Sequence, residues 1–147
     1  MTKTKSLGIL FYFCVFLACT QTQVNETTKS TRDAAFKDKY PKVEKVKWGI
    51  DDHGNHEAHF KQNGEKFRAD FTPAGQWIET ENSIKFKHLP KAVQEAVKRK
   101  YDEKDIVEIE AVNHFQKGIF YDVEIDEKGE KKIDIEYNAL GKIIGTE

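Results

Sequence analysis

The sequence predicts an α+β protein made of two tandem α-β-β-β-β repeats. The stretches FTPAGQWIETE (71–81) and YNALGKIIGTE (137–147) share an aromatic residue, a turn containing Gly, two apolar residues and a final Thr-Glu. Their offset is constant, 66 positions from 71 to 137 and from 81 to 147. In each half, a segment with helical spacing precedes segments in which apolar and polar residues alternate. The repeated ending is therefore the last hairpin of a duplicated unit.

The first repeat is expected to open with a short helix. Ser30 or Thr31 can cap it, Phe36 and Tyr40 lie at helical spacing, and Pro41 ends the run. Alternation then predicts four strands separated by the turns DDHGN, QNGE and TPAG, of which Asn-Gly is a strong hairpin signal. The residues expected to face inward are Val46, Trp48, Ile50, Ala58, Phe60, Phe67, Ala69 and Phe71.

The second repeat follows the same order. Leu89-Pro90 opens a helix whose apolar stripe includes Val93 and Val97 and which ends at Tyr101. Gly75 and Gly141 hold equivalent places in the final turns, where we expect a positive φ angle that Gly adopts without steric cost. The inward-facing residues expected here are Val107, Ile109, Ala111, Ile119, Tyr121, Val123, Ile125, Ile133, Ile135 and Tyr137, with Ile143 and Ile144 in the last strand.

The N-terminus is typical of an export signal. Two lysines precede an apolar run from Leu7 to Cys19, which is too short to span a bilayer as a helix. Its end, FLAC, resembles a bacterial lipobox, so residues 1–19 are interpreted as the signal and Cys19 as the lipidated residue. Ordinary secretion with cleavage near Ala18, or an uncleaved anchor, are the alternatives. A flexible polar tether at 20–32 and a folded domain at 33–147 follow, with repeats at 33–81 and 88–147.

Composition excludes several classes of function. Without the signal, 22 basic residues face 25 acidic ones, so nothing indicates a nucleic-acid partner. Both cysteines, Cys14 and Cys19, belong to the signal, so the body is expected to lack disulfides, thiol nucleophiles and cysteine metal sites. The few serines lie outside any nucleophile turn, and the acids are expected on solvated faces. We therefore expect no catalytic residues, no cofactor and no enzymatic activity.

The order of these elements resembles the PepSY-like, beta-lactamase-inhibitor-like family. The matching stretches are AAFKDKYPKVEKVKW, GEKFRADFTPAGQWIETE, LPKAVQEAVKRKY and GIFYDVEI with DIEYNALGKII. The resemblance implies an exported bacterial protein, commonly a lipoprotein, whose strands join into one curved antiparallel sheet with helices packed on one face. It implies no reaction, and no contact residue of an inhibitor can be carried over.

Three histidines, His53, His56 and His59, raise the possibility of a metal site. A zinc site needs converging ligands, whereas strand alternation places His56 and His59 on opposite faces and His53 in a turn. No metal site is therefore expected.

The outward-facing residues are divided by charge, basic in the first repeat and acidic in the second. A solvated face explains polar residues but not this division, and complementary fields steer partners. Phe120 shares the parity of the acids and is expected on the same exposed face. The candidate partner-binding face comprises Lys45, Lys47, Lys66, Arg68, Glu108, Glu110, Phe120, Asp122, Glu124, Asp134 and Glu136.

The first hypothesis is a non-catalytic module tethered to the envelope by lipid alone, located in the periplasm or at the outer membrane. It would bind an unknown envelope protein or peptide as an inhibitor or regulator. The second is a protein that binds a small ligand or cation through the acidic half of the sheet, and the third is an envelope enzyme. A concave pocket with converging acids would favour the second, and a buried titratable pair the third.

Overall fold

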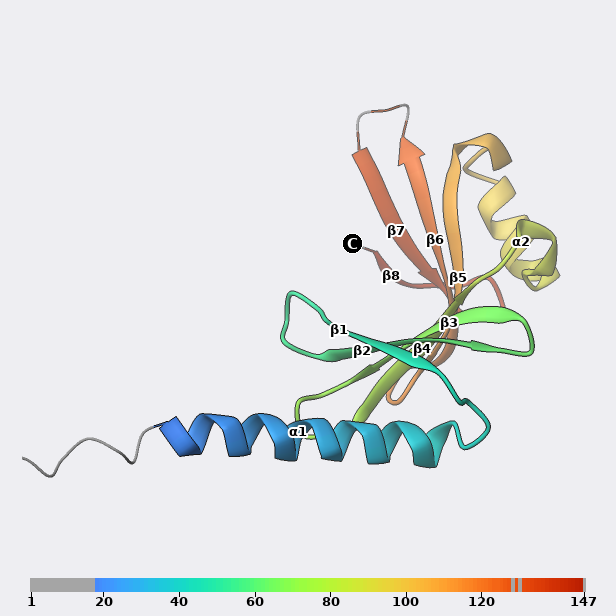
Figure 1. Cartoon of the computed structure of the whole chain (residues 1–147). Helices are drawn as coiled ribbons and strands as arrows, with labels where there is room; N and C mark the ends of the chain where they lie inside the picture. Colours follow the sequence, from blue (N-terminus) through green and yellow to red (C-terminus); the bar gives the residue numbers. More distant parts are fainter. Residues whose placement is uncertain (1–17, 128, 130, 147) are drawn as a thin grey trace, which may run out of the picture.

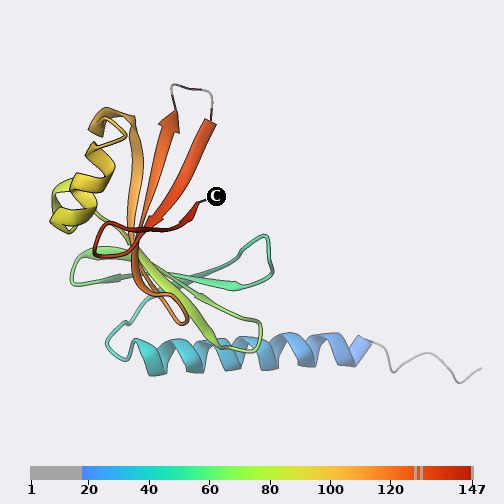
Figure 2. The ribbon, with the colours of Figure 1, turned by 180° about the vertical axis from the view of Figure 1, so that it is seen from behind.

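The computed structural model describes residues 18–127, 129 and 131–146. Figures 1 and 2 show a bent sheet with one helix along the outside of each half. The elements in chain order are α1 (Ala18–Lys39), β1 (Val46–Ile50), β2 (His56–Gln62), β3 (Glu65–Phe71), β4 (Trp77–Ser83), a 3-10 turn (Phe86–His88), α2 (Lys91–Lys98), a second 3-10 turn (Glu103–Asp105), β5 (Ile106–His114), β6 (Gly118–Glu127), β7 (Lys131–Tyr137) and β8 (Ile143–Thr146).

The eight strands form one antiparallel sheet in simple sequence order, β1 to β8. Each strand pairs with the next, so every connection within a repeat is a hairpin and β4 pairs with β5 across the two repeats. The predicted α+β architecture, with two α-β4 units sharing one curved sheet, is confirmed. A meander of this kind leaves β1 and β8 as the two edges.

Pairing register assigns the two faces of the sheet. Directly paired residues of neighbouring strands point to the same side, and Ala58, Ala69, Thr80 and Asn113 form one such row across β2–β5. This is the side on which both helices pack, and we call it the helix-covered face. The opposite side, which carries Arg68 and its row, is the open face.

Each helix covers its own apolar cluster. Under α1, Phe36 packs against Phe60, Phe71 and Trp48, with ring centroids 5.2, 6.3 and 5.6 Å away. Trp48 is half-buried there, in the predicted phase. The cluster under α2 is mainly aliphatic and comprises Phe86, Leu89, Val93, Val97, Ile109, Val123, Ile125, Ile135 and Tyr137.

The repeated endings are the points where each last hairpin meets its own helix. Gly75 and Gly141 have φ angles of 80° and 74°, as predicted. A Cβ atom on Gly75 would lie 2.9 Å from Thr31 Cγ2 of α1, and one on Gly141 would overlap the backbone oxygen of Ala92 in α2. Glycine is therefore needed twice for the same reason, a left-handed turn pressed against a helix.

The start of α1 differs from the expectation. The helix begins at Ala18 rather than beside Ser30 or Thr31, so the capping prediction is wrong, and the expected tether, 20–32, is helical. Residues 18–39 contain neither Gly nor Pro, so no residue of the stretch interrupts a helix. Its role as a tether stays a prediction. The signal prediction falls mostly on residues 1–17, outside the described residues.

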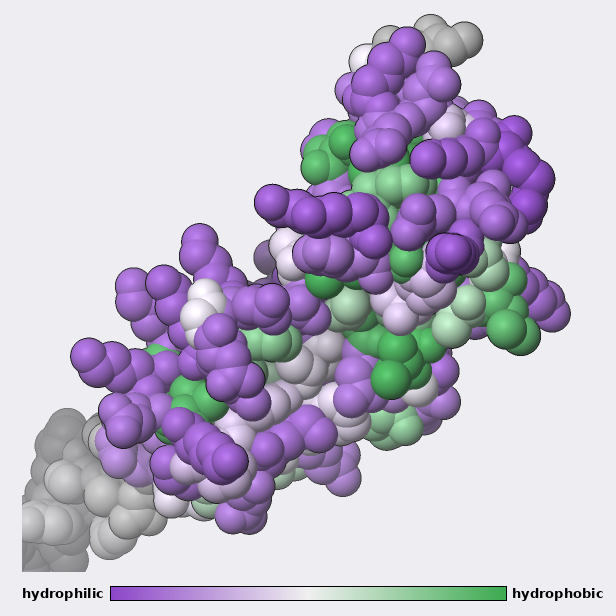
Figure 3. Space-filling model, turned by 90° about the vertical axis from the view of Figure 1, so that its right-hand side faces the viewer, coloured by the Kyte–Doolittle hydropathy of each residue, from purple (hydrophilic) through white to green (hydrophobic). Residues whose placement is uncertain are grey.

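Several residues predicted to face inward are exposed. Ile50 and Ile119 retain 67% and 64% of their accessible surface, and Val107, Ile143 and Ile144 are also exposed. Ile50 ends its strand, and β5 has an irregularity between Ile106 and Glu108 that breaks the alternation around Val107. Alternation gives the side of the sheet, but burial there also requires a helix above the residue. The view in Figure 3 accordingly shows apolar patches among mainly hydrophilic side chains.

Within residues 18–127, 129 and 131–146, no helix has the length and apolar character needed to cross a membrane.

Candidate functional site

The open face of the sheet is hollowed into an acidic trough of about 520 Å³. It runs across strands of both repeats because the sheet curves around it, with the helices on the outer side (Figure 1). Ten of its lining residues are acidic, whereas Arg68 and Lys117 are the basic ones apart from histidine. The trough is lined by Asp51, Asp52, His53, Glu57, Arg68, Asp70, Glu79, Glu81, Glu110, Val112, His114, Lys117, Phe120, Asp122, Asp134 and Glu136.

Carboxylates stand directly opposite one another on neighbouring strands of the trough. Glu110 pairs with Asp122, and Asp122 pairs with Glu136. The first repeat holds an equivalent row, the cross-strand partners Glu57, Asp70 and Glu79. Like charges in directly opposite positions destabilise a sheet. Two such rows in one trough therefore indicate a face shaped by something other than stability.

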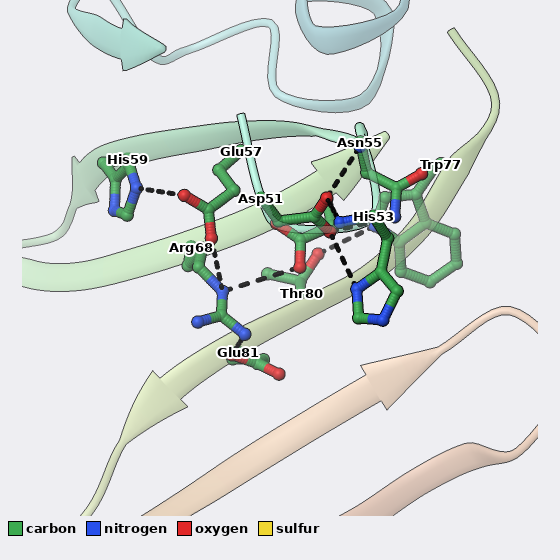
Figure 4. Close-up of polar contacts among 10 residues, drawn as sticks. Asp51, His53, Asn55, Glu57, His59, Arg68, Trp77, Thr80 and Glu81 are labelled. Atoms are coloured by element: carbon green, nitrogen blue, oxygen red, sulfur yellow. Dashed lines mark hydrogen bonds and ion pairs between the residues drawn. The ribbon is translucent and has the colours of Figure 1, made fainter. Parts of the chain in front are cut away.

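Arg68 is the central cation of the trough (Figure 4). Its Nη2 lies 2.5 Å from Glu81 Oε2, and its Nε lies 3.5 Å from Asp70 Oδ2 and 4.0 Å from Glu57 Oε1. Arg68 lies on β3 between β2 and β4, which supply Glu57 and Glu81, and Asp70 lies on β3 itself. One guanidinium group therefore contacts three carboxyl groups. Lys117 adds a second ion pair at the other end, with its Nζ 2.5 Å from Glu136 Oε1.

Buried carboxyl groups in the trough have raised pKa values. Burial, opposed by Arg68, raises the pKa of Asp70 to about 6, and burial with repulsion from Glu110 raises the pKa of Glu81 to about 8. Burial and neighbouring acids raise the pKa of Asp122 to about 6, and burial also raises that of Glu110. Burial and mutual repulsion thus disfavour the charged form of these carboxyl groups in the free protein.

This arrangement corrects the expectation that the acids lie on solvated faces. Asp70 and Glu81 retain only 6% and 7% of their accessible surface. Asp70 Oδ1 and Asp122 Oδ1 are buried without a hydrogen-bond partner among the described residues. The reason is that the sheet curves around the trough (Figure 1), so neighbouring side chains from both repeats cover these carboxyl groups.

Phe120 also differs from the expectation. It lies on the open face, as its parity predicts, but only 4% of its surface is accessible. It pairs with Val112, which is equally buried, and Lys117 Nζ lies 5.2 Å from the centre of its ring. Both apolar residues form part of the wall of the trough, and the lysine lies over the ring of Phe120.

The other predicted site residues divide between the trough and its surroundings. Arg68, Glu110, Asp122, Asp134 and Glu136 line the trough. The remaining five do not: Glu108 accepts a hydrogen bond of 2.6 Å from Ser83, Glu124 lies 2.7 Å from Lys132, and Lys45, Lys47 and Lys66 line a separate cavity.

Sequence reasoning missed the contribution of β4 and of the β1–β2 turn. Glu79 and Glu81 alternate with Thr80 in QWIETE, and this alternation was a sufficient signal for their face. Asp51, Asp52 and His53 reach the trough from a turn, whose direction alternation does not predict. These acids make the part of the first repeat that lines the trough acidic. The predicted division into a basic first repeat and an acidic second repeat is therefore wrong in detail.

The three histidines do not converge. His56 pairs with Phe71 on the helix-covered face, whereas His59 pairs with Arg68 on the open face, as strand alternation predicts. His53 lies in the β1–β2 turn, where its backbone N–H donates to Asp51. Among the residues that the structure describes, no group of three His, Cys, Asp or Glu side chains is placed to hold a metal ion.

Comparison with known protein families identifies the family of this chain. The family model described as "Putative beta-lactamase-inhibitor-like, PepSY-like" matches residues 54–145, from the turn before β2 to β8. The chain belongs to this family. The predicted resemblance is therefore confirmed, over seven of the eight strands and the whole trough except its contribution from Asp51, Asp52 and His53. No curated protein matches the chain.

Solved structures share the fold of this PepSY-like chain. A DUF2874 family protein from Bacteroides ovatus has a TM-score of 0.68 at 22% identity, covering 80% of this chain and 84% of the other. A "putative periplasmic" protein from Bacteroides eggerthii has a TM-score of 0.69 at 19% identity, covering 80% and 86%. A BLIP-like protein from Bacteroides fragilis has a TM-score of 0.67 at 18% identity, covering 80% and 84%.

Proposed function

We propose that the protein is a non-catalytic binding module of the cell envelope, whose acidic trough receives a cationic segment of another protein or peptide. The carrying observation is the pair of carboxylate rows: Arg68 and Lys117 pair with some of their members, whereas no ion pair is recorded among the described residues for Glu79, Glu110 or Asp122. A lysine or arginine side chain placed between the rows would relieve this repulsion. Natural proteins retain such locally unfavourable arrangements mainly where function requires them.

The electrostatics also support a charged partner over a neutral one. Ten acidic residues face two basic ones in a concave space, and a cleft lined by one sign of charge concentrates ligands of the opposite sign. Entry of a cation would lower the raised pKa values of Asp70, Asp122 and Glu81 and release protons. Binding should therefore strengthen as the pH rises through 6 to 8.

The test is a calorimetric titration of the purified protein with hexalysine at low salt, with hexaglutamate as the control peptide. The variant Glu110→Gln/Asp122→Asn/Glu136→Gln removes one carboxylate row. The matched variant Glu95→Gln/Asp102→Asn/Glu103→Gln removes three exposed acids outside the trough. We expect the first variant to lose at least tenfold in affinity and the second to change little. Equal binding by all three proteins would exclude the trough as the site.

A second candidate occupant is a small organic polycation. The volume of about 520 Å³ falls within the range of small-molecule sites, roughly 300–1,000 Å³. Spermidine in the same titration separates the two cases. Tight binding of spermidine with no gain from the longer hexalysine would favour a small ligand, whereas affinity that grows with peptide length would favour a protein segment.

The location in the envelope rests on the sequence and on the described periplasmic protein of similar fold. We propose that Cys19 carries lipid and that α1 then holds the sheet away from the membrane. The part of α1 that precedes its contact with the sheet at Thr31, residues 18–30, would span about 20 Å at ~1.5 Å per residue. Cys19→Ala should release the protein from the membrane fraction or block processing, and a variant that stays there with unchanged mobility would contradict the anchor.

A further inference from the structure

The two repeats place their carboxylates in equivalent rows on the open face. The offset of 66 positions that relates the repeated endings carries Asp70 of β3 to Glu136 of β7. Glu57 is the cross-strand partner of Asp70, and Asp122 is the cross-strand partner of Glu136, so Glu57 and Asp122 also correspond. The pairing therefore aligns the open faces of the two repeats position by position, and a difference between equivalent positions shows what one repeat has and the other lacks.

The central cation of the trough is replaced by an acid in the second repeat. In the first repeat, the guanidinium of Arg68 lies within 4.0 Å of carboxyl oxygens on β2, β3 and β4. Arg68 precedes Asp70 by two residues, and the equivalent position, two residues before Glu136, is occupied by Asp134. Both Asp134 and Glu136 line the trough. The place of a cation that links three strands therefore holds a negative charge in the second repeat.

The acids next to Asp134 lack a cation of the kind that Arg68 provides. Glu110 and Asp122 are direct cross-strand partners, and none of the recorded ion pairs among the described residues includes either of them. Burial, followed by repulsion from Asp134 and Glu110, raises the pKa of Asp122 to about 6, so the three carboxyl groups lie close together. Oδ1 of Asp122 is buried without a hydrogen-bond partner among the described residues.

Asp70 carries a second unpartnered oxygen into the trough. Its side chain lines the trough, retains 6% of its accessible surface and has no hydrogen-bond partner for Oδ1 among the described residues. Oδ2 of the same group lies 3.5 Å from Arg68 Nε. A buried polar atom without a partner indicates a water, an ion or a ligand that completes the site. The row that has its own arginine is therefore incomplete, and the row without one lacks more.

We propose that Glu110, Asp122 and Asp134 form a subsite for an arginine side chain of the partner. Its guanidinium would lie among these acids as that of Arg68 lies among the acids of the first repeat. The inference rests on the proposed function, in which the trough receives a cationic segment, and specifies the side chain and its place. A guanidinium presents several N–H donors in a planar fork and can reach several carboxylates at once, whereas a lysine ammonium is a compact, strongly hydrated charge.

The test compares hexaarginine with hexalysine, which have the same length and charge, in calorimetric titrations at pH 8 and low salt. Asp134→Arg gives the second repeat its own arginine at the position of Arg68, so it should fill the subsite from within. Asp102→Arg makes the same change of net charge at an exposed acid outside the trough. Asp122→Asn removes one carboxyl group of the subsite without changing its size, and Asp102→Asn is its control. Thermal melts of all variants separate lost binding from lost folding.

We expect the wild type to bind hexaarginine at least fivefold more tightly than hexalysine. Asp134→Arg and Asp122→Asn should each bring the two affinities within twofold of each other, whereas both Asp102 variants should keep the preference; if Asp134→Arg does not fold, Asp122→Asn decides by the same criterion. Equal binding of both peptides by the wild type, or a preference that survives in the folded subsite variants, would overturn the arginine subsite and leave the trough as the binding face. Binding of neither peptide would overturn the proposed function and the subsite with it.

Discussion

The two faces of the sheet are made by alternate residues of the same strands, yet they have opposite energetic roles. On β3, Phe71 is fully buried under α1, and its neighbour Asp70 is buried on the other side in the acidic trough. On β6, Val123 is fully buried and its neighbour Asp122 is half-buried in the trough. Burial of Phe71 and of Asp70 is nearly equal, so burial alone does not tell which residues hold the fold together.

The difference lies in what each face removes from water. Burying Phe71 or Val123 removes apolar surface, which stabilises the folded state. Burying Asp70 or Asp122 removes a carboxylate from water beside other carboxylates, which raises its pKa and disfavours the charged form. We infer that burial of apolar surface on the helix-covered face offsets the free-energy cost of burying carboxyl groups on the open face.

The largest effect is expected from Phe71→Ala on the helix-covered face. Truncation of a fully buried aromatic residue costs about 3–5 kcal/mol of unfolding free energy. This is a large share of a typical stability of roughly 5–15 kcal/mol. Urea denaturation measures it, with Lys47→Ala on the open side of edge strand β1 as a control expected within ~0.5 kcal/mol. Similar small losses in both variants would show that α1 does not anchor this half of the sheet.

The next effect is expected at the repeated glycines, where each last hairpin meets a helix. Gly141→Val forces a β-branched residue to a φ angle of 74° and pushes its Cβ into the backbone of Ala92, with strain of about 1–3 kcal/mol. Gly75→Val meets mainly the side chain of Thr31, which can move, so its loss of unfolding free energy should be smaller. The reverse order in denaturant midpoints would contradict the tighter α2 contact.

A change of opposite sign is expected on the open face. The pKa of Asp122 is raised from 3.8 to about 6, so this group favours the folded protein below pH 3.8 and its contribution is lost as the pH rises through 6. Asp122→Asn should therefore stabilise the protein at pH 8 by about 1–3 kcal/mol and change little at pH 4.

Thermal melts between pH 4 and pH 8 measure this difference, with the exposed Asp102→Asn as the control. A variant that is less stable than the wild type at pH 8 would show that the carboxylate of Asp122 is compensated in the free protein.

The smallest effect is expected from His56, the titrating group between α1 and β2. Both of its ring nitrogens are buried without a hydrogen-bond partner among the described residues. Burial, with repulsion from Arg32 opposed by Asp33, lowers its pKa below 6.5. Its contribution is therefore present above pH 6.5 and is lost as the pH falls, opposite in sign to that of Asp122.

His56→Phe should remove this loss, by about 1 kcal/mol or less, in melts at pH 5 compared with pH 7. The same variant should leave the pH dependence of the melting temperature unchanged between pH 7 and pH 8, because the carboxyl groups of the open face control this range. If the melting temperature of the variant depends on pH between 5 and 7 as that of the wild type does, the protonation of His56 is not coupled to folding.

The sequence by itself determined the repeat, the succession of strands and hairpins within it and the face of most strand residues. Alternation with a period of two is a local property, so Arg68, Asp70, Glu110 and Asp122 are assigned to one face without knowledge of the whole. The equivalent glycines were also predictable, because a turn that needs a positive φ angle selects Gly locally.

Only the tertiary structure decided how buried each face is. The alternation predicts on which side Ile50, Ile119 and Phe120 lie, but not that the first two are exposed or that Lys117 lies over the ring of the third. It likewise does not predict that Asp70 and Glu81 lose contact with water. Those outcomes depend on the curvature of eight strands and on the reach of α1 and α2, which are sums over contacts between distant segments and leave no local pattern in the sequence.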